Sequence, residues 1–251
     1  MSAARLVFVG GLHRSGTTLL AEMLAEHPEV GGLRDTGVPH DEGQHLQSYF
    51  PTAADLGGPG HFALDARAHL TEADVGDVDD ARRHLLSAWA PHWDTTRARL
   101  IEKSPPNLLR FRALQAIFPD SFLIAIVRHP VAVAYATEFW AERPADALFE
   151  HWLHAHELFE RDRPALRRLL FLRYETVVAD PNRALAEIDE FLGIAPHATD
   201  MPVRTDTNAR YFARFRHHRW RPAAWQIAPT VRRYETRLAA LDYAYSFHDR
   251  A

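Results

Sequence analysis

The stretch Phe8-Val9-Gly10-Gly11-Leu12-His13-Arg14-Ser15-Gly16-Thr17-Thr18-Leu19-Leu20 decides the fold. Residues 5–9 before it predict a short buried β-strand, and the apolar residues after it recur at helical spacing as far as His27-Pro28. A strand, a glycine loop and a helix N-terminus direct backbone N–H groups and the positive end of a helix dipole to one point. The sequence therefore predicts a phosphate-binding loop here.

This loop differs from the ATP-binding P-loop, whose pattern is G-x-x-x-x-G-K-[ST]. Gly11 and Gly16 have the right separation, but Thr17 stands where the lysine belongs, and the cation of the loop is Arg14. Without that lysine the site for β- and γ-phosphates and Mg²⁺ is incomplete. We expect a nucleotide with a single 5′-phosphate rather than a triphosphate.

The second informative feature is Lys103, the one lysine among 29 basic residues. An ammonium is a compact point charge, whereas a guanidinium is a planar fork, so the two are not interchangeable in tight geometry. Lys103 stands in the segment Glu102-Lys103-Ser104-Pro105-Pro106-Asn107, directly after a short strand expected at 99–101. We therefore expect a specific role for Lys103.

Composition limits the class of protein. The 251 residues suffice for one α/β domain, expected over residues 1–251, and the hydrophobic fraction of 47% is ordinary for a globular chain. A net charge of −4 argues against a nucleic-acid partner, and the absence of cysteine excludes disulfides and thiolate metal sites. The first strand begins too near Met1 for a signal peptide, and no apolar run approaches the about 20 residues that span a bilayer. We expect a cytoplasmic protein without a membrane partner.

Strands alternate with helices along the chain. Continuous apolar runs predict strands at 121–127 and 169–172, and helical periodicity predicts helices at 82–89, 107–118, 131–140, 145–159 and 181–192. The stretch 31–60 has little periodicity and is expected to form loop or short helices over an active face. The pattern predicts an α/β fold, a doubly wound parallel sheet flanked by helices, with ligands bound beyond the carboxyl ends of the strands.

Several motifs in order resemble the sulfotransferases that use 3′-phosphoadenosine-5′-phosphosulfate (PAPS), in style closest to the tyrosylprotein and carbohydrate branch and its bacterial relatives. The matching segments are Arg14-Ser-Gly-Thr-Thr18, Glu102-Lys-Ser-Pro105, Phe118-Pro119, Arg128-His-Pro130, Arg173-Tyr174-Glu175 and Ala179-Asp180-Pro181. They cover roughly residues 5–195. The resemblance implies the P-loop-like sulfotransferase fold and transfer of a sulfuryl group from PAPS to a hydroxyl of a small molecule, glycan or peptide.

The resemblance also implies residues that bind the donor. The 5′-phosphosulfate would be held by the loop residues Gly11, Arg14, Ser15, Gly16, Thr17 and Thr18. Arg128 would bind the 3′-phosphate, and Tyr174 would lie against the adenine or its ribose. Many members have a serine eight residues after that arginine; here the position is Ala136, with Thr137 adjacent as a substitute. Arg214 would supply the cation of a late 3′-phosphate segment.

The catalytic groups follow from charge. Negative charge builds on the oxygen that leaves toward the 5′-phosphate, so fixed donors there stabilise the transition state, and Lys103 and Arg14 are the candidates. The acceptor hydroxyl needs a general base. Asp35 falls where the tyrosylprotein branch has its base, Glu42 in Asp41-Glu42-Gly43-Gln44 competes with it, and His40 is third.

No metal is expected. The spacing of His151, His154 and His156 lacks a nearby carboxylate pair, and a sulfuryl group carries less charge than a phosphoryl group, so catalysis does not require a divalent cation. Two alternatives remain: a P-loop-type small-molecule kinase, and an inactive relative that binds a nucleotide without turnover, which Ala136 keeps open.

Overall fold

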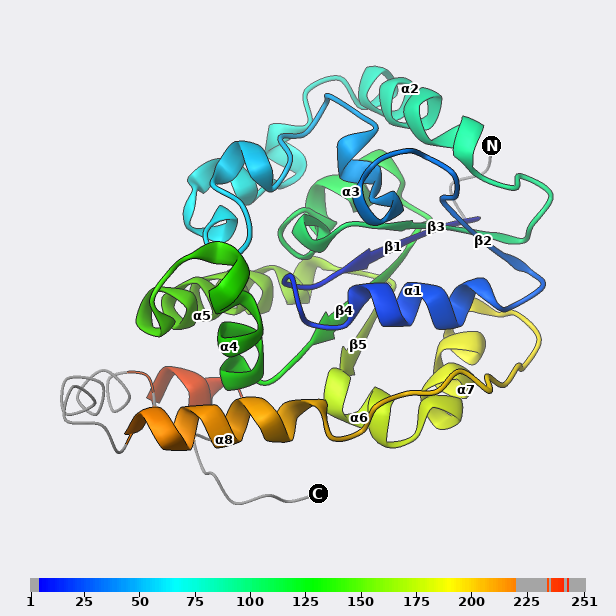
Figure 1. Cartoon of the computed structure of the whole chain (residues 1–251). Coiled ribbons are helices and arrows are strands. Elements are labelled where there is room, and N and C mark those ends of the chain that lie inside the picture. The colour runs from blue at the N-terminus through cyan, green and yellow to red at the C-terminus, as the bar shows by residue number, and fades with distance from the viewer. Residues whose placement is uncertain (1–4, 220–233, 235, 242, 244–251) are drawn as a thin grey trace.

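The structure, a computed structural model, describes residues 5–219, 234, 236–241 and 243 (Figure 1). In this part of the chain five parallel strands form one sheet in the order β2-β3-β1-β4-β5. The strands are β1 (Leu6–Gly10), β2 (Val30–Gly32), β3 (Arg99–Lys103), β4 (Phe122–Val127) and β5 (Leu169–Arg173). The chain starts at β1, runs outward to β2, returns through β3 and then crosses to β4. The loop after β1 therefore lies where the winding reverses, the usual ligand position in such sheets.

Helices cover both faces of the sheet because both faces are apolar. In β1, Val7 and Val9 belong to one buried cluster and Leu6 and Phe8 to the other, as the period of two in a strand requires. The first cluster includes residues of α1 (Thr17–Ala25), α6 (Tyr174–Ala179) and α7 (Pro181–Leu192). The second includes residues of α2 (Val78–Trp89), α3 (Phe111–Ile117), α4 (Pro130–Ala141) and α5 (Ala145–Asp162). Figure 1 shows α1, α6 and α7 on one side of the sheet and α2 and α3 on the other.

Local sequence explains where the helices near the site begin. Pro130 opens α4, where its missing N–H costs nothing, and Nδ1 of His129 accepts from the Val131 N–H at 3.2 Å. The α7 helix starts the same way at Pro181, and Asp180 caps the N–H of Arg183 at 3.0 Å. These signals fix where α4 begins after β4 and where α7 begins after α6.

The predicted fold class is confirmed, and the predicted strands and helices occur with boundaries shifted by a few residues. One strand was missed: β2 begins at Val30 and runs into the stretch 31–60, which was expected to hold loop or short helices. It has three residues, two of them glycine, too few to show a pattern. The helix predicted at 107–118 is a 3₁₀ helix at Pro105–Leu109 followed by α3. No helix among the described residues is both long and apolar enough to cross a bilayer.

Candidate functional site

The glycine loop adopts a conformation that few residues tolerate. Gly16 has φ 99° and ends the loop as the N-cap of α1, and Arg14 has φ 68°. A backbone hydrogen bond from the N–H of Ser15 to the carbonyl of Leu12 (3.0 Å) closes a turn over residues 12–15. The first N–H groups of a helix have no intrahelical partner, and Gly16 offers no side-chain cap, so this end of α1 suits an anion.

The loop is packed so closely that side chains are excluded at both glycines. A Cβ on Gly11 would lie 2.4 Å from the carbonyl oxygen of Ile126 in β4, and one on Gly16 would lie 2.5 Å from the ring of Tyr174. Ser15 is fully buried, and its Oγ has no hydrogen-bond partner within the described part of the chain. A buried hydroxyl without a partner is costly, which indicates a ligand group that completes the site.

Arg128 leaves the end of β4 and reaches the glycine loop. Its Nη1 donates to the carbonyl of Arg14 at 2.9 Å, and its guanidinium lies 4.2 Å from the centre of the Tyr174 ring. The side chain is buried, at 5% exposure, and burial lowers the pKa of Arg128 from its ordinary value. Its Nη2 has no partner among the described residues. A buried cation with a free donor lies beside the loop, as an anion site requires.

The helix α8 (Thr207–Arg219) covers Arg128 through Asn208, which belongs to the same late segment as Arg214, and through Tyr211, which was not singled out from the sequence. Nε of Arg128 donates to Oδ1 of Asn208 at 2.8 Å, and the Tyr211 ring centre lies 5.5 Å from the guanidinium. Asn208 is oriented in turn by Glu175, whose Oε1 accepts from Nδ2 of Asn208 at 2.8 Å. Tyrosine is common in any helix, so only the tertiary contact identifies Tyr211.

Two predicted donor-binding residues have other contacts. Arg214, on the same helix, pairs with Oε2 of Glu138 at 2.7 Å rather than with a group of the loop. The Thr137 hydroxyl donates to the carbonyl of Val133 at 2.7 Å, and a Cβ on Gly60 would lie 3.4 Å from its methyl group. The structure does not bring either side chain to Arg128, and their predicted roles stay predictions.

Lys103 ends β3 beside the start of α1. Its Nζ donates to Oε1 of Glu42 at 3.0 Å, to the carbonyl of His40 at 3.2 Å and, at 3.5 Å, to Oγ1 of Thr18. Lys103 and Glu42 are only 5% and 6% exposed, so they form a buried ion pair. Buried pairs add little stability because both charges lose water, so this pair is better explained by chemistry than by folding.

The three candidate bases occupy different positions. Glu42 contacts Lys103 directly. The backbone carbonyl of His40 contacts Lys103, and His40 is exposed and lines the cavity that opens beside Lys103. Asp35 is exposed, with φ 52°, and lines a separate cavity bounded by Trp93. Glu42 is the candidate that the structure places on the lysine.

His13 is a loop residue to which no role was assigned from the sequence. Burial above all, and then the charges of Lys103 and Arg14, lower the pKa of His13 to about 3. Its ring meets the edges of Phe62 and Trp140, each with centroids 5.4 Å apart, and its Nδ1 is buried without a partner among the described residues. Such a ring stays neutral at physiological pH. Its burial depends on distant aromatic residues, so no local pattern could reveal it.

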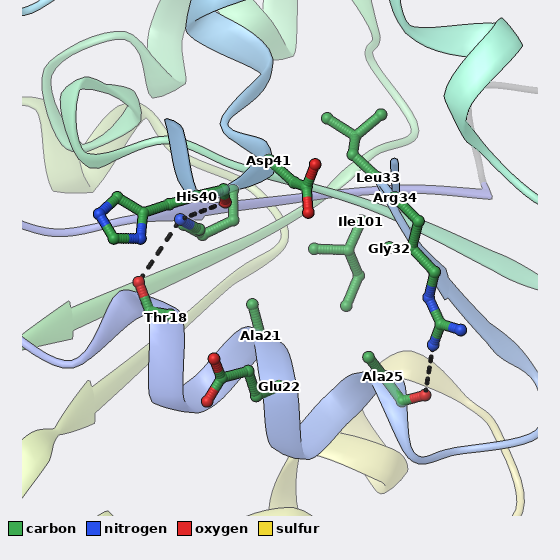
Figure 2. A pocket seen from close by; sticks show the side chains of 11 residues that line it. Thr18, Ala21, Glu22, Ala25, Gly32, Leu33, Arg34, His40, Asp41 and Ile101 are labelled. Carbon is green, nitrogen blue, oxygen red and sulfur yellow. Dashed lines mark hydrogen bonds between the residues drawn. The ribbon is translucent and has the colours of Figure 1, made fainter. Parts of the chain in front are cut away.

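A cavity opens beside Lys103. Its volume is about 260 Å³, and its lining includes Thr18, Ala21, Glu22, Arg34 and Asp41. Figure 2 shows α1 along one wall and Asp41 on the opposite one, pointing into the space. Two hydrogen bonds from Thr36 lower the pKa of Asp41, which keeps its carboxylate ionised. The cavity therefore places an ionised carboxylate across from α1 and beside Lys103.

Histidine clusters elsewhere carry little metal chemistry. Burial lowers the pKa of His151 well below its ordinary value and that of His156 to about 4. One group in the described part of the chain could hold a cation: His27, Asp189 and His197. Its ring nitrogens already have hydrogen-bond partners, including the Ala195 carbonyl 2.7 Å from Nε2 of His27.

Known proteins share this architecture. The sulfotransferase domain of the Synechococcus PCC 7002 olefin synthase superposes with a TM-score of 0.51 at 20% identity, over 82% of this chain and 86% of that one. Sulfotransferase STF9 from Mycobacterium avium gives a TM-score of 0.52 at 17% identity, over 87% of this chain and 69% of that one. At these identities the likeness concerns the fold.

Sequence comparison adds the family. Protein-tyrosine sulfotransferase 2 of Gallus gallus is 29% identical over 203 residues, 76% of this chain, and a putative protein-tyrosine sulfotransferase of Caenorhabditis briggsae is 25% identical over 205 residues, also 76% of it. This chain spans 51% of the first relative and 66% of the second. The profile of the sulfotransferase family matches residues 7–198, which include the glycine loop, Lys103, Arg128 and Tyr174. The chain belongs to the sulfotransferase family.

Proposed function

We propose that this chain transfers a sulfuryl group from PAPS to a hydroxyl of an acceptor bound in the cavity beside Lys103. The observation that carries the proposal is the hydrogen bond from Arg128 to the carbonyl of Arg14. It joins two anion-binding elements, the glycine loop and a buried guanidinium, in one site. A nucleotide with phosphate groups at both its 5′ and 3′ positions would engage both elements at once.

The residues present fit such a donor. Ser15 Oγ and Arg128 Nη2 are buried polar atoms that have no partner in the described part of the chain. The ring of Tyr174 packs against Gly16 and against the guanidinium, so it can support the nucleoside between the two phosphate positions. The first turn of α1 carries no acidic residue that would repel the donor.

Sulfuryl transfer joins the acceptor oxygen to sulfur as the bond from sulfur to the 5′-phosphate oxygen breaks. The chain contributes positive charge where that oxygen becomes negative. Lys103 lies beside Thr18 at the start of α1, and the guanidinium of Arg14 lies over the ring of Trp140, 5.2 Å from its centre. All three N–H groups of Lys103 already have acceptors, so Lys103 must give up one of them to donate to the leaving oxygen. The 3.5 Å contact to Thr18 is the weakest of the three.

Glu42 is the proposed general base. Its carboxylate lies on the ammonium of Lys103, so a proton taken from the acceptor hydroxyl is removed next to the group that stabilises the leaving oxygen. The proton leaves the acceptor oxygen, passes to Glu42 and returns to solvent after the product departs. Asp35 lines a separate cavity. His40 lines the cavity beside Lys103, but only its backbone carbonyl accepts from the ammonium, whereas the carboxylate of Glu42 does so directly.

Calorimetry with the product nucleotide, adenosine 3′,5′-bisphosphate, tests the donor. We expect it to bind more tightly than ATP with Mg²⁺, which needs the lysine that Thr17 replaces. Tighter binding of ATP would refute the proposal and favour a kinase.

Paired substitutions test the base. In assays of bisphosphate release from PAPS with phenols and alcohols as acceptors, Glu42→Gln should lower turnover by about 10²- to 10⁴-fold, and Asp35→Asn should leave it nearly unchanged. Bisphosphate binding by each variant shows that the protein is folded. The reverse ranking would assign the base to Asp35.

A further inference from the structure

We infer that Gln44 is a positioning residue. Its side-chain amide holds the carboxylate of Glu42 on Lys103, and buried hydrogen bonds through Ser104 anchor the backbone of Gln44 to Glu102. The inference rests on the proposed function, because it concerns the base of that reaction.

Gln44 is 3% exposed, and both ends of its amide have a partner. Its Nε2 donates to Oε2 of Glu42 at 2.5 Å, and its Oε1 accepts from the backbone N–H of Ala53 at 2.8 Å. A backbone N–H can only donate, so the amide cannot be flipped without losing both bonds. The orientation of Gln44 therefore follows from Ala53, and it presents a donor to Glu42.

Glu42 is consequently held at both oxygens. Oε2 accepts from Gln44 and Oε1 accepts from Lys103. A carboxylate oxygen has more than one lone-pair site, so each oxygen can still accept a proton from a substrate hydroxyl. Two donors on opposite oxygens fix the plane of the carboxylate, which leaves its free lone pairs in a defined direction.

A hydrogen-bonded chain attaches this loop to the sheet. The backbone N–H of Gln44 donates to Oγ of Ser104 at 2.9 Å, and the Ser104 hydroxyl donates to Oε1 of Glu102 at 2.5 Å. Nδ2 of Asn107 donates to the other oxygen of Glu102 at 2.5 Å. Burial raises the pKa of Glu102, although both hydrogen bonds oppose that shift. An acid kept in so costly a place, next to Lys103, indicates a function.

Gly43 allows the segment that carries Glu42 and Gln44 to pack directly against Glu102. A Cβ at Gly43 would be 2.6 Å from Oε1 of Glu102 and 2.8 Å from Nε1 of Trp89. The same indole N–H donates to the carbonyl of Gly43 at 3.0 Å. Base and lysine thus come from different segments, and the contacts of Gly43 and Gln44 set the distance between them.

The isosteric change Gln44→Glu isolates the positioning role. It keeps the size of the side chain and the acceptor for Ala53 but turns the donor into an oxygen facing Glu42. The change therefore tests the donor of the side chain rather than its volume. The matched control is Gln47→Ala, since Gln47 is buried in the same loop, bonds to the carbonyls of Gln44 and Phe50, and has no contact with Glu42.

The lysine composition provides a direct readout. Because Lys103 is the one lysine of the chain, a ¹H–¹⁵N spectrum selective for lysine ammonium groups contains a single signal. We expect that signal to shift or broaden in Gln44→Glu and to keep its position in Gln47→Ala. With an acceptor that the wild type sulfates, kcat should fall about 10²-fold in Gln44→Glu, with KM for PAPS unchanged, as for a misplaced catalytic group.

An unchanged Lys103 signal in Gln44→Glu would overturn the inference, and so would an equal shift in Gln47→Ala. If Gln44→Glu does not fold, Gln44→Ala carries the test, because it removes the same donor without adding charge. Calorimetry with adenosine 3′,5′-bisphosphate on the same samples separates the two proposals. A wild type that fails to bind it refutes the proposed function, while the spectrum still decides the role of Gln44.

Discussion

Arg128→Ala should remove the preference of the site for a 3′-phosphate. The side chain has two structural bonds, to the Arg14 carbonyl and to Asn208, and its Nη2 is free of partners among the described residues. If Nη2 donates to the 3′-phosphate of the donor, its loss must weaken ligands that carry that phosphate more than ligands that lack it.

The size of the effect follows from one charge-assisted hydrogen bond, worth about 1.5–3 kcal/mol. At about 1.4 kcal/mol per factor of ten, the loss amounts to roughly 10- to 100-fold in Kd. Arg128→Ala also removes the bond that holds the loop at Arg14, which weakens any nucleotide. Comparing two ligands on the same variants cancels that shared part.

Calorimetry of adenosine 3′,5′-bisphosphate and adenosine 5′-phosphate on the wild type and on Arg128→Ala measures the difference. Arg128→Lys, which keeps the charge but loses the planar fork, should give an intermediate value. Equal weakening of both ligands by Arg128→Ala would mean that Arg128 only supports the loop, and the 3′-phosphate assignment would be refuted.

Three further changes test other parts of the site. Gly16→Ala should abolish bisphosphate binding because its Cβ would strike Tyr174. Gly37→Ala is the control: Gly37 also has a positive φ (73° against 99°) but open space around a Cβ, so this variant should bind normally. Equal effects of the two changes would show that backbone strain alone matters. Gly32 lines the cavity and has nothing within 4 Å of a Cβ, so Gly32→Trp should lower turnover while bisphosphate affinity is unchanged, and undiminished turnover would place the acceptor elsewhere. The pKa of His13 is lowered to about 3 in the folded protein, so on acidification the unfolded state takes up a proton at a higher pH than the folded state does. The free energy of unfolding therefore decreases as pH falls from about 6.5 toward 3. Denaturant titrations should show a smaller decrease in His13→Phe, and an identical pH dependence in the two proteins would contradict that pKa.

The sequence predicted the parts of the site that depend on local signals. The loop 11–18 combines glycine spacing with a strand and a helix, and Lys103, Arg128 and Tyr174 each lie where an apolar run ends. Parallel strands bring such ends to one edge of the sheet, so residues distant in sequence could be placed together without a structure.

The rest depends on contacts that no local pattern contains. Asp35 and Glu42 were equivalent in sequence, and the bonds of Glu42 to Lys103 and Gln44 distinguish them. The late segment that holds Arg214 was expected to supply a cation to the 3′-phosphate. Its helix α8 contacts Arg128 through Asn208 and Tyr211 instead, because the helix turns Arg214 toward Glu138. Side-chain direction along a helix is set by packing against its neighbours, which composition does not show.

The most direct test of the central claim is a crystal structure with adenosine 3′,5′-bisphosphate bound. We expect its 5′-phosphate at the start of α1, against Ser15 and Gly16, and its 3′-phosphate on Nη2 of Arg128. A bisphosphate bound with its 3′-phosphate away from Arg128, or outside the glycine loop altogether, would contradict the proposed donor and the reaction built on it.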